Sequence, residues 1–142
     1  MSNAKGVTLF ETLIALLVAG FFATAAIPPI YRAQQELRFG AIAYRVRSQL
    51  HRIRILSIAR DQDCRFAVLS PTSYRIECET PAWVTLETHE LPPGFGISAN
   101  ARPEFHPLGN VGPMATIRIQ NEDGKEKRVI VSRSGRVRME SD

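Results

Sequence analysis

The sequence lacks the short motifs that usually mark an active site. It has no Gly-x-Ser-x-Gly pattern and no glycine-rich loop of the kind that cradles phosphates. Its three histidines, His51, His89 and His106, are isolated, and their spacing fits no set of metal ligands. Isolated histidines are more often surface or packing residues than ligands. We therefore expect no catalysis and no bound metal or cofactor.

Charge is nearly missing from residues 7–30, where Glu11 is the only charged side chain. As a helix this run of 24 residues extends about 36 Å, at about 1.5 Å per residue. The hydrocarbon core of a bilayer is about 30 Å thick. A helix satisfies its backbone groups internally, so it is the single-segment structure that can span this core. The run therefore predicts a transmembrane helix over residues 7–30.

Composition leaves two other interpretations of this run open. One is a core helix, although an apolar helix of this length is unusual in a chain of 142 residues. The other is a cleaved secretory signal, because Ala23-Thr24-Ala25 resembles a cleavage site; the early Glu11 argues against it. Lys5 agrees weakly with a cytoplasmic N-terminus, while Arg32 and Arg38 beyond the run oppose that trend.

A different helical pattern follows over residues 31–60. Arg38, Arg45 and Arg52 lie off an apolar stripe and predict a solvated face. Pro28-Pro29 predicts a kink before this segment, and Asp61-Gln62-Asp63 predicts its end. We expect the stripe to pack on a sheet. Its members recur at steps of three and four: Phe39, Ile42, Val46, Leu50, Ile53 and Leu56.

Residues 61–142 predict a β-rich globular domain. Ser70-Pro71-Thr72-Ser73 separates two short strand-like runs, and a hairpin centred on Pro71 pairs Cys64 with Cys78, Phe66 with Ile76, and Val68 with Tyr74. The opposite face of this hairpin is expected to be more polar. Further strands are predicted at Trp83–Leu86, Phe95–Ser98, Ala115–Gln120, Lys127–Ser132 and Arg136–Met139.

Cysteine is scarce, with only Cys64 and Cys78 in the chain. In an exported domain two cysteines are expected to pair, and the hairpin register brings these two together. The bond closes a loop of about 15 residues, which the chain-entropy account values at about 3 kcal/mol. Two reduced thiols packed in the core are the alternative.

The formal net charge of +4 is unevenly distributed along the chain. Residues 32–60 carry a net charge of +6, residues 61–124 carry −5, and residues 125–142 carry +3. Two basic zones therefore flank an acidic middle.

The segment Lys5-Gly6-Val7-Thr8-Leu9-Phe10-Glu11 resembles the prepilin peptidase motif of type IV pilins and type II secretion pseudopilins. The resemblance implies a leader of residues 1–6, with cleavage between Gly6 and Val7 and N-methylation of Val7. Val7 departs from the Phe or Met that the family most often has there. Glu11 becomes the fifth residue of the mature chain, where the resemblance implies that it faces an N-terminal amine during filament assembly.

This resemblance implies an α+β, type IV pilin-like fold, with a long N-terminal helix packed on an antiparallel β-rich domain. The implied chain is a single-pass protein of the bacterial inner membrane, which prepilin peptidase processes. It then assembles with other major and minor pilins into a periplasmic or cell-surface filament.

The C-terminal region resembles the FimT and GspH group of minor pilins and pseudopilins. In FimT-like proteins of competent bacteria, a C-terminal Gly-Arg-x-Arg motif is implicated in binding DNA for uptake. Gly135-Arg136-Val137-Arg138 matches that motif residue by residue. The matching segments are Phe105-His106-Pro107-Leu108-Gly109, Ala115-Thr116-Ile117-Arg118-Ile119 and residues 129–138.

The motif suits the task of binding double-stranded DNA. Gly135 allows the positive φ of a tight turn. Arg136 and Arg138 then project from one strand face about 6.6 Å apart, with Val137 and Met139 toward the core. Two adjacent guanidinium groups bind phosphates without reading sequence. The patch is expected to extend to Lys125, Lys127, Arg128 and Arg133.

Three alternatives to DNA binding stay open. The chain could be a minor pseudopilin of a type II secretion system, or a structural initiator of pilus assembly. The basic hairpin could also be a solvated edge whose cations only block strand pairing.

Overall fold

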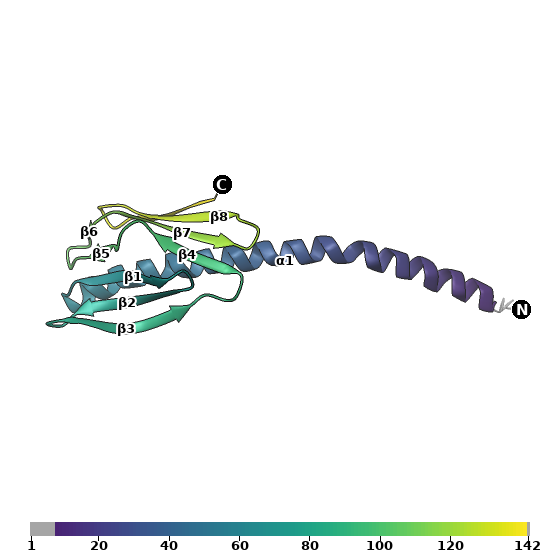
Figure 1. Cartoon of the computed structure of the whole chain (residues 1–142), viewed down its shortest axis with the longest axis horizontal. Coiled ribbons are helices and arrows are strands. Elements are labelled where there is room, and N and C mark those ends of the chain that lie inside the picture. The colour runs from purple at the N-terminus through teal and green to yellow at the C-terminus, as the bar shows by residue number, and fades with distance from the viewer. Residues whose placement is uncertain (1–7, 142) are drawn as a thin grey trace, which may run out of the picture. The chain divides into compact units, whose positions relative to one another are not determined.

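The computed structural model describes residues 8–141, without the side chains of residues 25–29 and 141. One long helix, α1 (Leu9–Arg60), precedes the strands (Figure 1). Thr8 caps this helix, because its Oγ1 accepts a hydrogen bond from the backbone N–H of Glu11 at 3.3 Å. The Thr-x-x-Glu spacing is the sequence signal for such a cap, and it places Glu11 in the first turn, at the positive end of the helix dipole.

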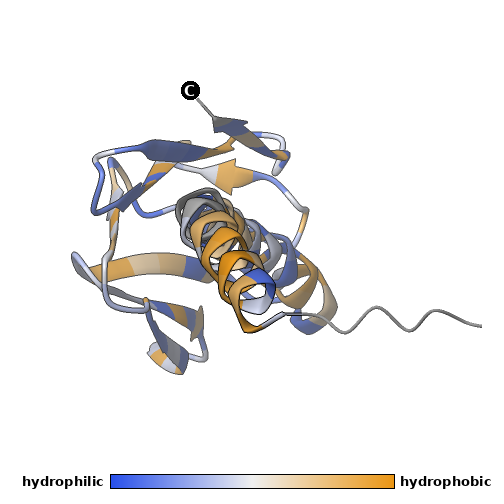
Figure 2. Cartoon of the chain, turned by 90° about the vertical axis from the view of Figure 1, so that its right-hand side faces the viewer, coloured by the Kyte–Doolittle hydropathy of each residue, from blue (hydrophilic) through white to orange (hydrophobic). Residues whose placement is uncertain are grey.

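The predicted leader 1–6 and the cleavage site at Gly6 and Val7 lie outside the described residues. The large apolar side chains from Leu9 to Phe22 are exposed, and the turns nearest the viewer in Figure 2 are coloured as hydrophobic. Thr12 and Thr24 donate their hydroxyl hydrogen bonds to carbonyl groups three residues earlier, both at 2.8 Å. No helical segment of the described residues meets the length and apolarity of a candidate membrane span. The membrane helix therefore stays a prediction.

The chain divides into two compact units, Met1–Arg38 and Phe39–Asp142. The second unit includes the part of α1 from Phe39 onward, whereas the sequence-based division began the globular part at residue 61. The predicted apolar stripe is confirmed as part of its core, since Phe39, Val46, Leu50 and Ile53 are at most 1% exposed. Ile42 and Leu56 are partly buried against the same cluster. The helix ends at Arg60 as predicted, where Asp61 takes a left-handed φ of 53°.

Nine strands, counted over residues 8–141, form two antiparallel sheets in the second unit. The first sheet has the order β3-β2-β1-β5-β6, and the second has the order β4-β7-β8-β9. Within this unit the sheets flank the part of α1 from Phe39 onward (Figure 2), and side chains from that part and from both sheets share one buried cluster. The bounds are β1 (Cys64–Ser70), β2 (Ser73–Glu79), β3 (Trp83–Glu90), β4 (Phe95–Ala99), β5 (Glu104–Phe105), β6 (Val111–Gly112), β7 (Ala115–Asn121), β8 (Glu126–Val131) and β9 (Val137–Ser141).

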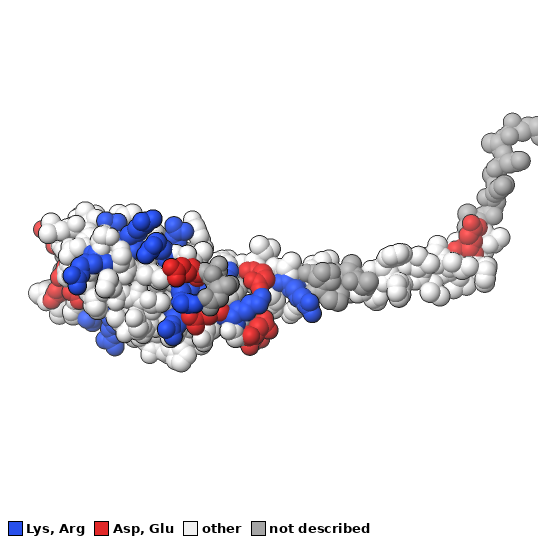
Figure 3. Space-filling view, turned by 90° about the horizontal axis from the view of Figure 1, so that it is seen from above, with Lys and Arg blue, Asp and Glu red and all other residues white. Residues whose placement is uncertain are grey.

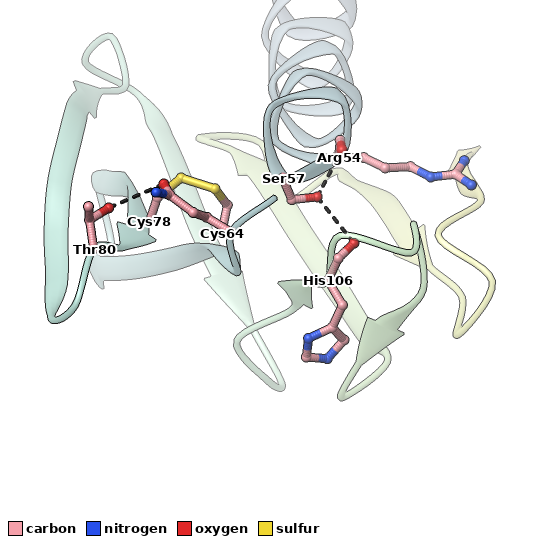
Figure 4. The surroundings of a disulfide bond; sticks show 7 residues. Arg54, Ser57, Cys64, Cys78, Thr80 and His106 are labelled. Atoms are coloured by element: carbon pink, nitrogen blue, oxygen red, sulfur yellow. Dashed lines mark hydrogen bonds between the residues drawn. A yellow bond between two sulfur atoms is a disulfide. The ribbon is translucent and has the colours of Figure 1, made fainter. Parts of the chain in front are cut away.

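The predicted register of the first hairpin is confirmed. β1 and β2 pair Cys64 with Cys78, and the other two predicted pairs also face each other. The two cysteines form a disulfide bond (Figure 4) and are at most 1% exposed. The strands predicted further along the chain are also present, with the largest shift in bounds at the end of β3.

The opposite face of this hairpin carries the predicted polar residues, and one of them, Glu77, is only 3% exposed. Its carboxylate lies 2.5 Å from Arg65 Nε and 2.6 Å from Arg75 Nε. Only the Arg65 contact has hydrogen-bond geometry. Arg65 in turn covers the ring of Trp83, with its Cζ 3.9 Å from the ring centroid. The buried carboxylate is therefore held between two cations.

Candidate functional site

The turn between β8 and β9 carries the Gly-Arg-x-Arg motif. Gly135 has a φ of +75°, as predicted for a tight turn. The backbone N–H of Gly135 donates to the Ser132 carbonyl at 2.9 Å, and that of Ser132 donates to the Arg136 carbonyl at 3.0 Å. Arg133 and Arg136 are both exposed. The turn therefore holds two cationic side chains at the end of the second sheet.

β9 alternates as the motif predicts, except at its end. Val137 is 3% exposed and faces the core, while Arg138 is exposed on the outer side. Met139 was expected in the core, yet it is 39% exposed. β9 is the edge strand of its sheet, so none of the strands in the described part of the chain covers that side. The prediction for Met139 was therefore wrong in its degree of burial.

The outer face of the second sheet places three arginines on neighbouring strands. Arg138 pairs with Ile130 of β8, and Arg128 lies two residues from Ile130 on the same face. Arg128 directly faces Arg118 of β7. Directly opposite residues have Cβ atoms roughly 5 Å apart and diagonal ones are roughly 7–8 Å apart, so Arg118 adjoins Arg128, and Arg138 lies diagonally beyond Arg128. Arg118 was not among the predicted site residues, although its alternation with Ile117 and Ile119 gives the signal.

Carboxylates reduce the charge of this face on two strands, since Glu140 of β9 directly faces Arg128 and Glu126 of β8 lies beside it. Glu126 lies 3.2 Å from Arg128 and 3.7 Å from Arg118. Within residues 8–141, by contrast, no carboxylate lies in ion-pair distance of Arg133, Arg136 or Arg138. Figure 3, viewed onto this sheet, shows Lys and Arg side chains gathered with acidic ones beside them. The strongest positive charge is therefore at the β8–β9 turn and at the start of β9, at Arg133, Arg136 and Arg138.

Two predicted site residues lie away from this group. Lys127 shares the inner face of β8 with Val129 and Val131, and its Nζ lies 4.8 Å from the ring centroid of Phe39. Lys125 is exposed in the turn between β7 and β8. Because β8 and β9 are antiparallel, that turn lies at the far end of β8 from the Gly135 turn.

A groove of about 590 Å³ adjoins the outer face at β4. Arg118 and Arg102 both line it, together with Ser98, Asn100 and Gln120. The turn between β1 and β2 forms its other wall. The groove extends the basic surface past β4, the edge strand opposite β9 in the second sheet.

Three side chains that could hold a cation meet at the first sheet. The ligand atoms of Asp63, Glu104 and His106 lie within 4.8 Å of one another. Burial, reinforced by the charge of Asp63, raises the pKa of the Glu104 carboxyl above its ordinary value. Two of the three groups already bond each other, since His106 Nδ1 and Asp63 Oδ1 form a hydrogen bond of 2.9 Å. We assign no metal site here, and sequence spacing gave no signal for this group because the pairing of β1 with β5 creates it.

The sequence matches no protein-family model and no curated protein. Its fold is similar to solved structures of a minor pseudopilin and of a type IV minor pilin. The minor pseudopilin EpsH from the type 2 secretion system of Vibrio cholerae has a TM-score of 0.64 at 14% identity, over 72% of this chain and 95% of that one. The type IV minor pilin FimU of Pseudomonas aeruginosa has a TM-score of 0.61 at 14% identity, over 75% of this chain and 90% of that one.

These similarities confirm the predicted α+β, type IV pilin-like fold. At such identities they establish the fold alone. Neither structure is a FimT protein, so the resemblance to that group stays a prediction.

Proposed function

We propose that this chain is a minor subunit of a type IV pilus-like filament that binds double-stranded DNA without sequence preference, for uptake in natural transformation. The observation that carries the DNA-binding part is the exposed group Arg133, Arg136 and Arg138. These guanidinium groups have no carboxylate partner among the described residues. Exposed, unpaired guanidinium groups are ready to bind phosphate oxygens.

The filament part of the proposal rests on the fold and on the N-terminal helix. EpsH and FimU are a minor pseudopilin and a minor pilin. The exposed apolar side chains of α1 between Leu9 and Phe22 need a cover, and the helices of other pilins or the inner membrane provide one. Prepilin peptidase is the proposed processing enzyme at Gly6 and Val7, and Glu11 then takes part in assembly.

The second sheet suggests how the nucleic acid lies. Neighbouring strands are about 4.8 Å apart, so Arg138, Arg128 and Arg118 step across the sheet from its edge toward the groove. A phosphate backbone that crosses the strands in this direction meets successive guanidinium groups. Each contact releases condensed counterions and contributes affinity that falls with salt. Base edges are not needed for this mode, so sequence preference is not expected.

An electrophoretic shift assay on the full chain in detergent micelles tests the proposal. The test variant is Arg136→Ala with Arg138→Ala, and the matched control is Arg38→Ala with Arg45→Ala, which removes the same charge from exposed helix positions. We expect the wild type and the control to bind alike at low salt and the test variant to bind at least roughly tenfold more weakly. Equal binding by all three proteins would remove the motif from the mechanism.

The similarity to EpsH supports a second candidate, a minor pseudopilin of a type II secretion filament. The two candidates differ in their partner, since a pseudopilin of this kind has protein partners and does not need DNA. Absence of DNA binding by the wild type at low salt contradicts the first candidate and favours the second. A structural role in filament initiation makes the same prediction.

A further inference from the structure

The helix contributes an arginine to the turn that carries the DNA-binding motif. Arg54 belongs to α1, and its side chain extends to the loop between β8 and β9 (Figure 4). A Cβ placed on Gly135 would lie 2.8 Å from Arg54 Nε and 3.1 Å from its Cζ. One placed on Gly109 would lie 3.3 Å from an Nη of the same group. The guanidinium therefore lies against two glycine turns, of which the Gly135 turn has no room for a side chain and the Gly109 turn is tight.

Hydrogen bonds fix the surroundings of this guanidinium. The buried Ser57 Oγ donates toward the carbonyl groups of Arg54, at 2.9 Å, and His106, at 3.4 Å (Figure 4). The N–H of Gly109 donates to the His106 carbonyl at 2.8 Å, and the N–H of Val111 donates to the Arg133 carbonyl at 2.8 Å. These hydrogen bonds join three elements around Arg54: the helix α1, the turn at residues 106–109 and the β8–β9 turn. Residues 105–109, which resemble the FimT and GspH group, thus form one side of this junction.

Within residues 8–141, the guanidinium of Arg54 has no carboxylate as an ion-pair partner. Its Nε is buried and has no hydrogen-bond partner, and the residues that the structure describes bring no carboxylate within 4.0 Å of it. The nearby ionisable groups on the helix do not neutralise the charge of Arg54, because Arg47 is itself a cation. The pKa of His51 is lowered by burial and by the charges of Arg47 and Arg54, so its ring adds no negative charge here. A partly buried cation without a partner is unfavourable, so this site calls for an anion.

We propose that Arg54 is a further phosphate-binding arginine of the DNA interface, supplied by the helix rather than by the hairpin. This inference rests on the proposed function. The ligand chemistry follows from the site: Arg133 and Arg136 are exposed in the turn that Arg54 contacts, so an oxyanion meets cations from two elements. A DNA phosphate bound there connects α1 to the hairpin through one ligand.

Equilibrium DNA binding by the full chain in detergent micelles tests the inference. We expect Arg54→Met to weaken binding by roughly threefold to tenfold and to lower the slope of log affinity against log salt by about 1, as the loss of one phosphate contact does. Arg54→Lys keeps the charge and should recover the slope, though not the full affinity. Arg45→Met, at an exposed helix position, is the matched control and should bind like the wild type. Wild-type affinity and slope in Arg54→Met would overturn the inference.

A second measurement separates this inference from the proposed function, and it needs no folded Arg54→Met protein. The ¹⁵N signal of the Arg54 Nε–H group in the wild type is assigned by its absence in Arg54→Lys. Inorganic phosphate and duplex DNA are then titrated separately. If the Arg54 signal shifts with phosphate but the protein does not bind DNA, Arg54 belongs to an anion site and the proposed DNA function is refuted. No shift with either probe overturns the site itself.

Discussion

Replacing Gly135 by alanine separates two demands that the structure makes on this residue. The first demand is conformational, since φ is +75° and an L-residue is strained there. The second is steric, because the new Cβ would collide with the carbonyl oxygen of Gly109 and lie 2.8 Å from Arg54 Nε. Gly124 offers a matched control. Its φ is +78°, and a Cβ there would meet nothing within 4 Å.

The magnitudes follow from this comparison. Gly124→Ala should cost about 1–2 kcal/mol of the free energy of unfolding, the ordinary penalty of left-handed backbone. Gly135→Ala should cost the same amount plus about 1–3 kcal/mol, because overpacking forces the Gly109 turn and Arg54 to move. For a domain of about 60–100 residues, 1 kcal/mol changes Tm by about 4–8 °C. The Tm of Gly135→Ala should thus fall below that of Gly124→Ala by at least roughly 4 °C.

Thermal unfolding of the full chain in detergent micelles, followed by near-ultraviolet circular dichroism, measures the difference. The wild type and both variants are compared at one pH and one salt concentration. Equal Tm values for the two alanine variants would refute the close contact between the Gly135 turn, Gly109 and Arg54. That result would leave only the turn geometry as the reason for glycine in the motif.

Three further predictions follow from the second unit. Reduction of the Cys64–Cys78 disulfide, which joins residues 14 apart in sequence, should add two hydrogens to the intact mass and lower the free energy of unfolding by about 3 kcal/mol; an unchanged mass would show that the thiols are free. Glu77→Gln should lower the free energy of unfolding in urea by about 3 kcal/mol, the low end for a broken buried pair because both arginines keep some contact with water; a loss no larger than for exposed Glu122→Gln would contradict the buried pairing. Because the pKa of Glu104 is raised by burial and by Asp63, its stabilising contribution is full below the ordinary pKa of about 4.3 and is lost as the pH rises through the higher value of the folded state. The Tm of Glu104→Gln relative to that of the wild type should therefore rise as the pH increases from about 4 to 7. A Tm difference that does not change with pH would contradict this direction.

The sequence predicts best those elements whose pattern is local. The first hairpin follows from alternation about Pro71, and its register placed the two cysteines opposite each other. The helical stripe follows in the same way from spacing alone. β5 and β6 were not predicted, because strands of two residues are too short to show any periodicity.

The candidate site was only partly predictable, because much of it depends on which face a strand turns to the core. Lys127 was included in the basic patch, although its alternation with Val129 and Val131 places it on the inner face. The same alternation could have identified Arg118. Arg54 could not have been found in this way, since its place is set by Gly109 and Gly135, which are far from it in sequence. The burial of Glu77 likewise depends on Arg65 and Arg75 from neighbouring strand positions.

The salt dependence of DNA affinity tests the central claim most directly. We would measure the affinity of the full chain for two duplexes of unrelated sequence across a series of salt concentrations. We expect equal affinities for both duplexes and a steep loss of affinity with salt. For Arg136→Ala with Arg138→Ala we expect a slope shallower by about 2, one unit for each phosphate contact removed. Parallel lines for the wild type and the double variant, or a strong preference for one duplex, would contradict this claim.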